Sequence, residues 1–298
     1  MWWWLLPFTV YRLHPDTTNS SERNYSNFVF TFPTVHSPHN NVHLKKLSVT
    51  STHSFKQNME DKYHSEPNIS FIVTGFGPFR GMDENPTTNI IRHLQSEKEK
   101  GNLEQHIEFT KVITTSASSA KNEVNEIMQY IIRSTKEIYE QKDTPRKHWV
   151  IVHLGVNHMK GRKPSFQLEQ NAYNEANFRI ADEDGFQPKN ERIILDGTLK
   201  LATDINVRRV MANLNDFDVV LSGDAGRFVC NYIYYTSLNA IQETFGGDDT
   251  SSDIHVHSLF VHVPKFDAFA EDVQFDFSKR LLNAISEAIL AKNKKKNI

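Results

Sequence analysis

The sequence predicts an α/β fold: a single three-layer α/β/α domain with a largely parallel, mixed central sheet. Two observations predict it. Short, unbroken apolar runs, typical of strands buried on both faces, alternate along the chain with segments of helical apolar periodicity. Such alternation indicates parallel strands joined by helices that cover both faces of one sheet. We expect this domain over residues 69–298, after a low-order extension over residues 1–68.

The first half of the domain alternates predicted strands with predicted helices. Strands are expected over 71–74, 107–115 and 149–154. A helix should follow the turn at 83–87, with Ile90, Ile91 and Leu94 on one face, and a second helix should occupy 118–141. The apolar residues of this second helix recur at helical spacing, at Val124, Ile127, Met128, Ile131 and Ile138.

The second half begins with an irregular region to about residue 202, where only short strands are expected. Asp204 is predicted to cap a helix that carries Val207, Val210, Met211 and Leu214. Residues 219–221 form an apolar run typical of a strand buried on both faces, and 222–224 are turn and helix-start residues. A surface loop at 246–252, a strand at 254–263 and an amphipathic helix at 277–292 complete the domain.

The composition excludes several classes of protein. The 298 residues are 38% hydrophobic and carry a net charge of −2, without the basic excess of a nucleic-acid-binding protein. A single cysteine cannot form an internal disulfide and fits a reducing compartment, so a cytoplasmic protein is expected. No apolar run approaches the roughly 20 residues that a membrane helix needs, so no membrane association is expected.

The first 67 residues show little organisation. The opening MWWWLLPFTV is apolar enough for the core of a signal peptide, but no basic residue precedes it and no small-residue cleavage site follows. Secretion is therefore the weaker interpretation. The polar stretch that follows lacks a sustained period, apart from a local strand expected at 28–32. We interpret the cluster of His36, His39 and His43 as part of this polar stretch rather than as a metal site.

Chemistry is expected at the carboxyl ends of the strands, where active sites of open α/β sheets gather. These predicted ends are 75–76, 153–154, 222–223 and 262–263, each followed by glycine, polar residues or proline. Cys230 falls near the start of the helix that follows one of these strands. There the unpaired backbone N–H groups and the helix dipole favour a thiolate. The alternative is that Cys230 is a small buried apolar residue.

The segment around Cys230, DVVLSGDAGRFVCNYIYYTSL over 218–238, favours the reactive cysteine. It resembles the pyroglutamyl-peptidase I family of cysteine peptidases, whose nucleophile lies in S-x-D-A-G-x-[FY]-[LV]-C followed by aromatic residues and T-S-L. The resemblance covers roughly residues 70–292 and is strong in three separated segments. It implies that Cys230 is the nucleophile of a Cys-His-Glu triad that needs no metal and no cofactor.

The base of the triad is expected at His262. Among 14 histidines it lies at the end of an apolar strand, where an imidazole is held rigidly, although such a histidine is often a plain core residue. His255 and His257 compete, because their spacing places both on one strand face as a conceivable metal pair without a clear third ligand. The family's catalytic histidine sits in F-V-H-V-P, and only His262 matches this motif.

The third member of the triad is expected at Glu169. The segment 168–180 resembles the family's L-E-x-x-A-x-N-x-x-x-x-R-[IV], in which the glutamate completes the triad. Glu175 is the local competitor, but the neighbouring alanine, asparagine and arginine fix the register. By the same resemblance Arg179 lies near the catalytic centre, where it would hold Glu169 or the nearby substrate carbonyl.

The loop after the first strand is expected to bind substrate. Its sequence GFGPFRG with Asn85-Pro86-Thr87 resembles the family's G-F-x-P-F-G-G and N-P-[ST], and it fits no phosphate-binding motif. Phenylalanines on a glycine- and proline-containing loop form a flat apolar wall that suits a small uncharged lactam ring. The residues expected to bind it are Phe76, Phe79, Asn85 and Phe228.

The resemblance implies a hydrolase, a thiol-dependent omega peptidase that removes N-terminal pyroglutamyl residues from peptides through a thioester acyl-enzyme. Two departures leave an alternative open. Arg80 replaces the first glycine of the usual Gly-Gly pair, and the loop at 156–162 has only loose similarity to its family counterpart. The alternative is a catalytically degenerate family member that binds peptides. A phosphorylase-like α/β protein that acts on nucleosides is a weaker alternative. The sequence does not fix the oligomeric state.

Overall fold

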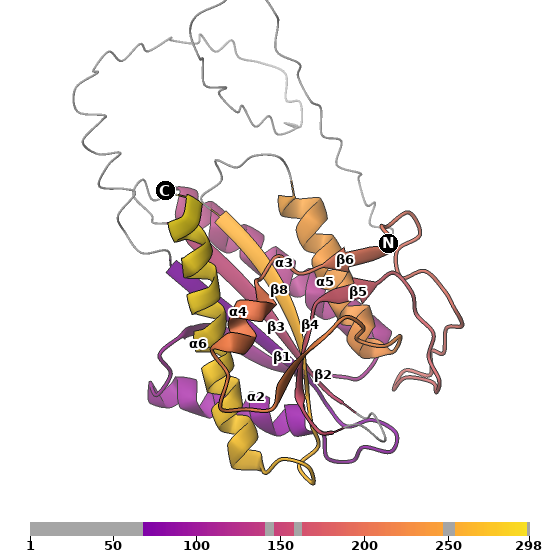
Figure 1. The fold of residues 1–298 in the computed structure, drawn as a ribbon. Helices are drawn as coiled ribbons and strands as arrows, with labels where there is room; N and C mark the ends of the chain where they lie inside the picture. The colour runs from indigo at the N-terminus through magenta and orange to yellow at the C-terminus, as the bar shows by residue number, and fades with distance from the viewer. Residues whose placement is uncertain (1–67, 141–145, 158–162, 247–253, 297–298) are drawn as a thin grey trace, which may run out of the picture. The chain divides into compact units, whose positions relative to one another are not determined.

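The structure is a computed structural model that describes residues 68–140, 146–157, 163–246 and 254–296 (Figure 1). All of these ranges lie within one compact unit, Ser51–Ile298. The expected strand at 28–32, the cluster of His36, His39 and His43, and most of the loop at 246–252 lie outside the described residues. The boundary predicted at residue 68 stays a prediction, although Asn68 already belongs to the first described strand.

The centre of the described domain is a six-stranded sheet with the order β2-β1-β3-β8-β4-β7. Four of these strands, β2 (His106–Ile113), β1 (Asn68–Phe76), β3 (Lys147–Val156) and β8 (Ile254–Val263), run parallel to one another. The strand β4 (Phe166–Glu169) runs antiparallel to β8, and β7 (Val219–Ser222) runs parallel to β4. A small separate sheet pairs β5 (Asn171–Tyr173) with β6 (Lys200–Ala202).

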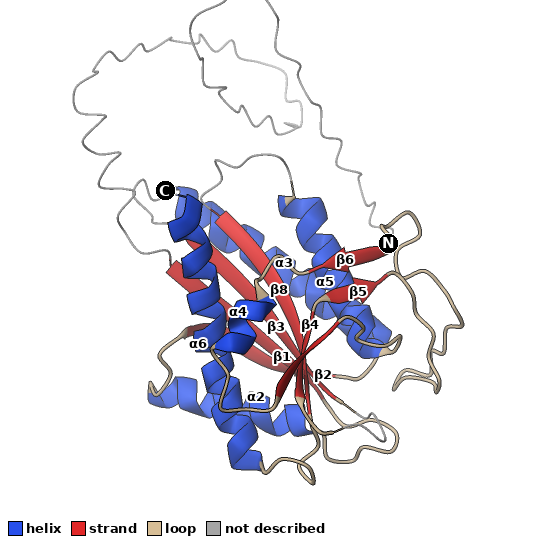
Figure 2. Cartoon of the chain, viewed as in Figure 1, coloured by secondary structure: helices blue, strands red, loops and turns tan. Residues whose placement is uncertain are grey.

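Helices cover both faces of the sheet (Figure 2), which confirms the predicted three-layer α/β/α fold. On one face, the first core cluster includes side chains from α2 (Pro86–Lys100), α4 (Val207–Ala212) and α6 (Glu271–Lys296). On the other face, the second cluster includes side chains from α3 (Ala117–Glu140) and α5 (Val229–Phe245). The apolar faces predicted for the first two helices are buried, as Ile90, Leu94 and Ile127 show.

The strand before Cys230 differs from its prediction. We predicted that Val219, Val220 and Leu221 would be buried on both faces, but β7 is the edge strand of the sheet. Val219 and Leu221 pack against the first core cluster, whereas Val220 points to the other face and is 43% exposed. A run of three apolar residues cannot distinguish an edge strand with one covered face from a central strand with two. Because β7 runs antiparallel to β8, its end at Ser222 lies level with Phe260 and not with the carboxyl end of β8.

Three helix starts also differ from the sequence prediction. Asn206, not Asp204, caps α4 by accepting a hydrogen bond from the Arg209 N–H, while the Asp204 carboxylate pairs with His257. The helix α5 begins at Val229 rather than near Asp224, because Gly226 adopts a left-handed conformation with φ of 84° that ends a tight turn. The helix α6 begins at Glu271, six residues before the predicted start, with acidic residues in its first turn.

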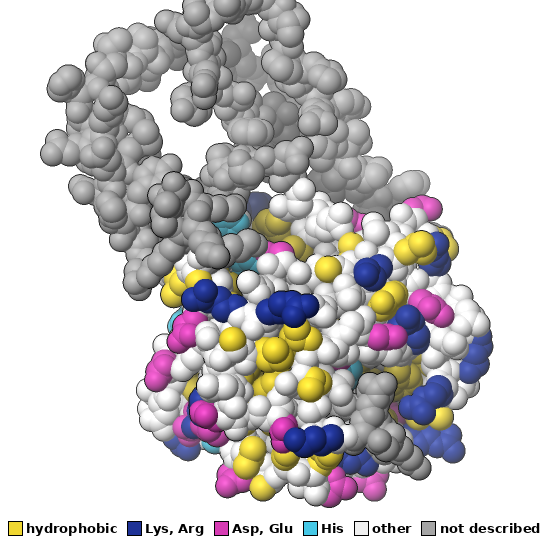
Figure 3. Space-filling view, in the orientation of Figure 1, with side chains coloured by type: hydrophobic (Ala, Val, Ile, Leu, Met, Phe, Trp, Pro, Cys, Tyr) yellow, Lys and Arg dark blue, Asp and Glu magenta, His cyan; other side chains and the backbone are white. Residues whose placement is uncertain are grey.

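Charges are dispersed over the described surface. On the face drawn in Figure 3, basic and acidic side chains are interspersed, in keeping with the net charge of −2. No helix in the described ranges is both long and apolar enough to cross a membrane.

Candidate active site

One cavity of about 970 Å³ lies beside the amino-terminal end of α5 and the carboxyl ends of β1, β3 and β8. All of the predicted site residues except Glu169 line it, namely Phe76, Phe79, Asn85, Arg179, Phe228, Cys230 and His262. The cavity therefore gathers residues from four separated parts of the sequence. This is the arrangement expected when loops and helix starts meet at one edge of a largely parallel sheet.

Cys230 is the second residue of α5, so it lies near a helix start, as predicted, although the helix begins later than expected. The helix starts after Phe228, which has an extended backbone and offers no side-chain cap. The first-turn N–H groups are therefore available to a negatively charged group near the thiol. Gly155 makes room for this thiol from β3: a Cβ atom at that position would lie 2.9 Å from the Cys230 Sγ and 2.6 Å from the Phe260 Cζ.

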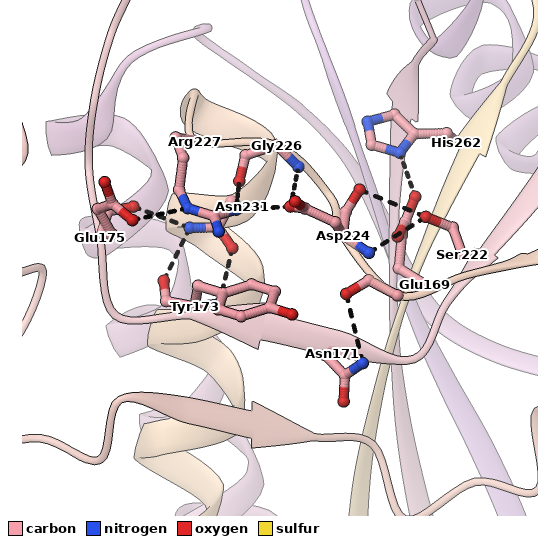
Figure 4. A network of polar contacts seen from close by, with 11 residues as sticks. Glu169, Asn171, Tyr173, Glu175, Ser222, Asp224, Gly226, Arg227, Asn231 and His262 are labelled. Atoms are coloured by element: carbon pink, nitrogen blue, oxygen red, sulfur yellow. Dashed lines mark hydrogen bonds and ion pairs between the residues drawn. The ribbon is translucent and has the colours of Figure 1, made fainter.

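His262 and Glu169 form a buried pair beside this cysteine. The His262 Nδ1 lies 2.8 Å from the Glu169 Oε1, and the two residues are 8% and 0% exposed (Figure 4). They come from β8 and β4, adjacent antiparallel strands whose register places Gln167 opposite His262 and Glu169 opposite Phe260. Cys230 lies close enough to His262 to influence the protonation of its ring.

The protonation of His262 follows from these neighbours. Burial by itself lowers the pKa of His262, but hydrogen bonds and charge interactions with Cys230 and Glu169 outweigh it and raise the pKa to about 10. These contacts favour the imidazolium form of His262. An imidazolium beside the sulfur stabilises the thiolate form of a cysteine.

Tyr234 supports this pair from α5, and the sequence analysis did not single it out. Its hydroxyl donates a hydrogen bond of 2.9 Å to the backbone carbonyl of Glu169, and its side chain is fully buried. Cys230 and Tyr234 are four residues apart, so they lie on the same side of α5. The helix that carries the thiol thus also fixes the strand that carries the carboxylate. The four-residue spacing between Cys230 and Tyr234 is the sequence feature that could have indicated this role.

The loop after β1 is held by Asn85 and Thr87. The Asn85 amide donates to the Gly77 carbonyl, and its oxygen accepts hydrogen bonds from the Thr87 N–H and hydroxyl. Asn85 is also the N-cap of α2 and is only 1% exposed. These contacts give Asn85 the role of shaping the cavity wall, since both ends of its amide are engaged within the loop.

Aromatic side chains form one wall of the cavity. The rings of Phe79 and Phe228 lie 6.4 Å apart, and Phe228 packs edge-on against Phe178 at 4.7 Å. Phe178, which is fully buried, was not among the predicted binding residues and acts as the backing of this wall. The Phe76 side chain is buried in the second core cluster. A flat apolar surface of this kind suits a small uncharged ring.

Arg179 and Arg80 both line the cavity and are exposed. Arg179 forms no salt bridge with Glu169 within 4.0 Å in the described part of the chain, where the partner of Glu169 is His262. Arg179 lines the cavity, and its contact with a bound substrate stays a prediction. The backbone N–H of Arg80 donates to the Glu183 Oε1, which ties the loop after β1 to a distant segment.

Arg227 organises the turn that leads into α5 (Figure 4). Its guanidinium pairs with Glu175 at 2.9 Å and with Asp224 at 2.5 Å, and it lies over the Tyr173 ring at 4.2 Å. Asn231 adds hydrogen bonds to the Tyr173 backbone and the Glu175 carbonyl. Glu175, the sequence competitor of Glu169, is thus a partner of Arg227 and does not contact His262.

The competing histidines lie at the other end of the sheet. His257 bonds to Asp204 at 2.8 Å and to His148 at 2.9 Å, and His255 stacks on His148. His148 and His255 are neighbours at the amino ends of β3 and β8, whereas Cys230 lies at their carboxyl ends. In the described ranges, no group of three or more potential ligands is arranged to hold a metal ion.

Comparison with known proteins gives consistent matches. The sequence profile of the family described as pyroglutamyl peptidase matches residues 69–276. The chain is 27% identical to a pyrrolidone-carboxylate peptidase of Fusobacterium nucleatum over 195 residues, which is 65% of this chain and 77% of the relative. It is 26% identical to human pyroglutamyl-peptidase 1 over 229 residues, which is 76% of this chain and 91% of the relative.

The fold also matches solved structures. The crystal structure of pyroglutamyl peptidase I from Bacillus amyloliquefaciens aligns with a TM-score of 0.58 at 21% identity, covering 73% of this chain and 97% of that one. A mutant pyrrolidone carboxyl peptidase from P. furiosus aligns with a TM-score of 0.57 at 22% identity, covering 73% and 98%. At these identities the structures support the fold alone.

Proposed function

The chain belongs to the pyroglutamyl peptidase family, and from this premise we propose that it removes N-terminal pyroglutamyl residues from peptides by cysteine catalysis. The observation that supports the proposal is that Cys230 of α5 and His262 of β8 line one cavity with an aromatic wall, and that Glu169 of β4 lies 2.8 Å from the His262 Nδ1. A cytoplasmic location stays a prediction.

The first half of the proposed reaction forms a thioester. The Cys230 thiolate attacks the acyl carbonyl carbon of the pyroglutamyl residue, and the carbonyl oxygen becomes an oxyanion. Backbone N–H groups in the first turn of α5 stabilise that oxyanion. The His262 imidazolium then donates its proton to the leaving amine as the carbon–nitrogen bond breaks. Glu169 holds the imidazole ring in the orientation and tautomer that this transfer requires.

The second half of the reaction releases pyroglutamate. His262, now neutral, takes a proton from a water molecule that attacks the thioester carbonyl. The carbon–sulfur bond breaks, the acid leaves, and the thiolate–imidazolium pair forms again. These steps use Cys230, His262, Glu169 and backbone N–H groups only, so the proposal assigns no step to a metal or cofactor.

Substrate choice follows from the aromatic wall. A pyroglutamyl ring has no ionisable amine, so apolar contacts with Phe76, Phe79 and Phe228 suit it better than a charged pocket would. A free N-terminal amine placed against these rings would lose its hydration, and the carboxylate among the described lining residues, Asp224, is already paired with Arg227. Peptides that begin with glutamate or glutamine are therefore expected to be poor substrates.

Hydrolysis of the fluorogenic amide of pyroglutamate and 7-amino-4-methylcoumarin tests the proposed function. We expect turnover that iodoacetamide abolishes, because Cys230 is the single cysteine of the chain. Absence of turnover by folded, reduced protein would contradict the peptidase activity and favour the peptide-binding alternative. Arg80→Gly would then be the first variant to assay.

Replacing Gly155 with alanine is expected to lower kcat at least about 10²-fold, the cost of a misplacement of about 1 Å in a catalytic group. The new methyl group would meet both Phe260 and the Cys230 sulfur at less than 3.0 Å, and so it displaces the thiol. Gly77→Ala is the matched control, because its nearest contact would be the Ile113 carbonyl oxygen at 3.5 Å. Equal kcat values for the two variants would show that Gly155 does not set the position of the thiol.

Replacing Glu169 with glutamine should lower kcat/KM and also shift the alkaline limb of its pH profile to lower pH. Glu169 contributes to raising the pKa of His262 to about 10, so its neutralisation lowers that pKa and moves the alkaline limb to lower pH. Loss of one charge-assisted hydrogen bond should reduce kcat/KM by about 10- to 100-fold at neutral pH. Glu175→Gln is the control, because Glu175 pairs with Arg227 and should leave the limb in place. An unshifted limb in Glu169→Gln would contradict the triad assignment.

A further inference from the structure

One row of side chains crosses the cavity from the aromatic wall to the edge of the sheet. The strand register pairs Gly155 with His262, His262 with Gln167, and Gln167 with Val220. Phe76 continues this row on β1, because Gly75 pairs with Leu154 and the next residues along the two strands are Phe76 and Gly155. Residues paired directly across neighbouring strands point to the same face of a sheet. Phe76, His262, Gln167 and Val220 line the cavity, and a Cβ atom added at Gly155 would lie 2.9 Å from the Cys230 Sγ.

The order of this row gives the substrate a direction. Phe76 and Phe79 of the aromatic wall lie at the end of β1, on one side of Cys230, and His262, which protonates the leaving amine in the proposed reaction, lies on the β8 side. The leaving peptide must therefore extend away from Phe76, over β4 and then β7. The last two positions of the row, Gln167 and Val220, are the side chains it would meet there.

Gln167 has the properties of a binding residue. It is 6% exposed, its side chain lines the cavity, and its amide makes no hydrogen bond to another described residue. A side-chain amide both donates and accepts hydrogen bonds, so its natural partner is a peptide group, which does the same. The catalytic steps described above do not use Gln167. Burying a polar side chain of this kind is favourable only when it finds a partner.

The spacing of the strands allows an extended peptide to reach both residues. Adjacent strands lie about 4.8 Å apart, so Gln167 is about 4.8 Å from His262 across the sheet and Val220 about 9.6 Å. An extended peptide advances at most about 3.6 Å per residue. With the leaving nitrogen above His262, the next peptide group lies about 3.6 Å along the chain, within reach of the Gln167 side chain. The second leaving residue then spans about 3.6–7.2 Å, between Gln167 and Val220, so its side chain is within reach of Val220.

We propose that Gln167 hydrogen-bonds the first peptide group of the leaving segment and that Val220 contacts the side chain of the second leaving residue. The two residues form a leaving-peptide subsite on β4 and β7. Val220 is 43% exposed and lies on the edge strand, so an extended substrate has access to it in the described part of the domain. This inference rests on the proposed peptidase function and extends it to the residues after pyroglutamate.

Two substrates separate the subsite from the catalytic centre. Pyroglutamyl-Ala-Ala-amide has the peptide group that Gln167 would bind, whereas the pyroglutamyl coumarin amide has none in that position. Gln167→Leu is expected to lower kcat/KM for the peptide by about 10- to 100-fold and to change it for the coumarin amide less than about threefold. The peptide ends in an uncharged amide, so no terminal carboxylate can form an ion pair with Arg80 or Arg179. Gln170→Leu, on the same segment but outside the cavity, should change neither value.

The outcomes distinguish the inference from the function. If wild-type protein hydrolyses neither substrate, the proposed function is wrong, and the leaving-peptide subsite is wrong with it. If Gln167→Leu lowers kcat/KM equally for both substrates, Gln167 acts through His262 and not on the leaving peptide. If it lowers kcat/KM for neither substrate, Gln167 has no role in binding. Either result overturns the proposed subsite. Retained hydrolysis of the coumarin amide also shows that the variant is folded.

Charge placed at Val220 gives a second, independent test. Val220→Asp and Val220→Lys are assayed with pyroglutamyl-Ala-Lys-amide and pyroglutamyl-Ala-Glu-amide. The preference for lysine over glutamate should rise about two- to fivefold in Val220→Asp and fall by a similar factor in Val220→Lys, the size of one exposed ion pair. Contributions of other charges are common to both variants and cancel in the ratio. Identical preferences in the two variants would place the second leaving residue elsewhere.

Discussion

Replacing Cys230 with alanine is expected to lower kcat/KM for pyroglutamyl substrates by at least about 10⁴-fold, because the attacking atom of the reaction is removed. Cys230→Ser should be nearly as inactive. A serine hydroxyl is a much weaker acid than a thiol, so the introduced serine should not form the anion that the proposed attack requires. The measurement is the initial rate on the coumarin amide, with the variants prepared free of wild-type protein.

Cys230→Ala should keep the ability to bind substrate. The ring wall is made by Phe76, Phe79 and Phe228, and the alanine leaves their packing unchanged. A pyroglutamyl peptide should therefore still protect the variant against thermal unfolding. Wild-type turnover in Cys230→Ala would refute cysteine catalysis. A variant that neither turns over nor binds would mean that the thiol position is also needed to form the ring pocket.

The sequence was sufficient for the parts of this fold that depend on local patterns. Unbroken apolar runs predicted β1, β3 and β8, and all three are central strands with both faces covered. The glycine-containing turn before Cys230 predicted a helix start near the thiol, and α5 begins one residue before it. The sequence also predicted the nucleophile, because a single cysteine in a specific motif leaves one candidate.

The sequence was insufficient wherever strand order decides the outcome. The β4–β7 pair is reversed relative to β8, and no local pattern records this reversal. As a result, the sequence predicts a buried Val220 and gives no sign that Gln167 lies beside the site. Both become visible only when the register aligns them with His262. Glu169 was assigned by resemblance alone, and its burial beside His262 depends on the same antiparallel pairing.

Replacing His262 with alanine is expected to lower kcat/KM by about 10²–10⁴-fold, the usual loss when a general acid–base is removed. Two functions disappear together, since the ring protonates the leaving amine and its positive charge stabilises the thiolate. Alkylation of Cys230 by iodoacetamide at neutral pH should therefore also slow. A measured slowing of hydrolysis without any slowing of alkylation would show that the imidazolium does not activate the thiol.

Loss of stability in His262→Ala must be separated from loss of catalysis. Removing the imidazole leaves the fully buried Glu169 carboxylate without its partner, which costs about 3–5 kcal/mol for a buried ion pair. The double variant His262→Ala, Glu169→Gln removes the unpaired charge and should recover much of the thermal stability while remaining inactive. Free imidazole should restore part of the activity of the single variant, because it fits the space left by the ring and can again bond to Glu169. Recovery of activity in the double variant without imidazole would contradict the role of His262 as the acid–base.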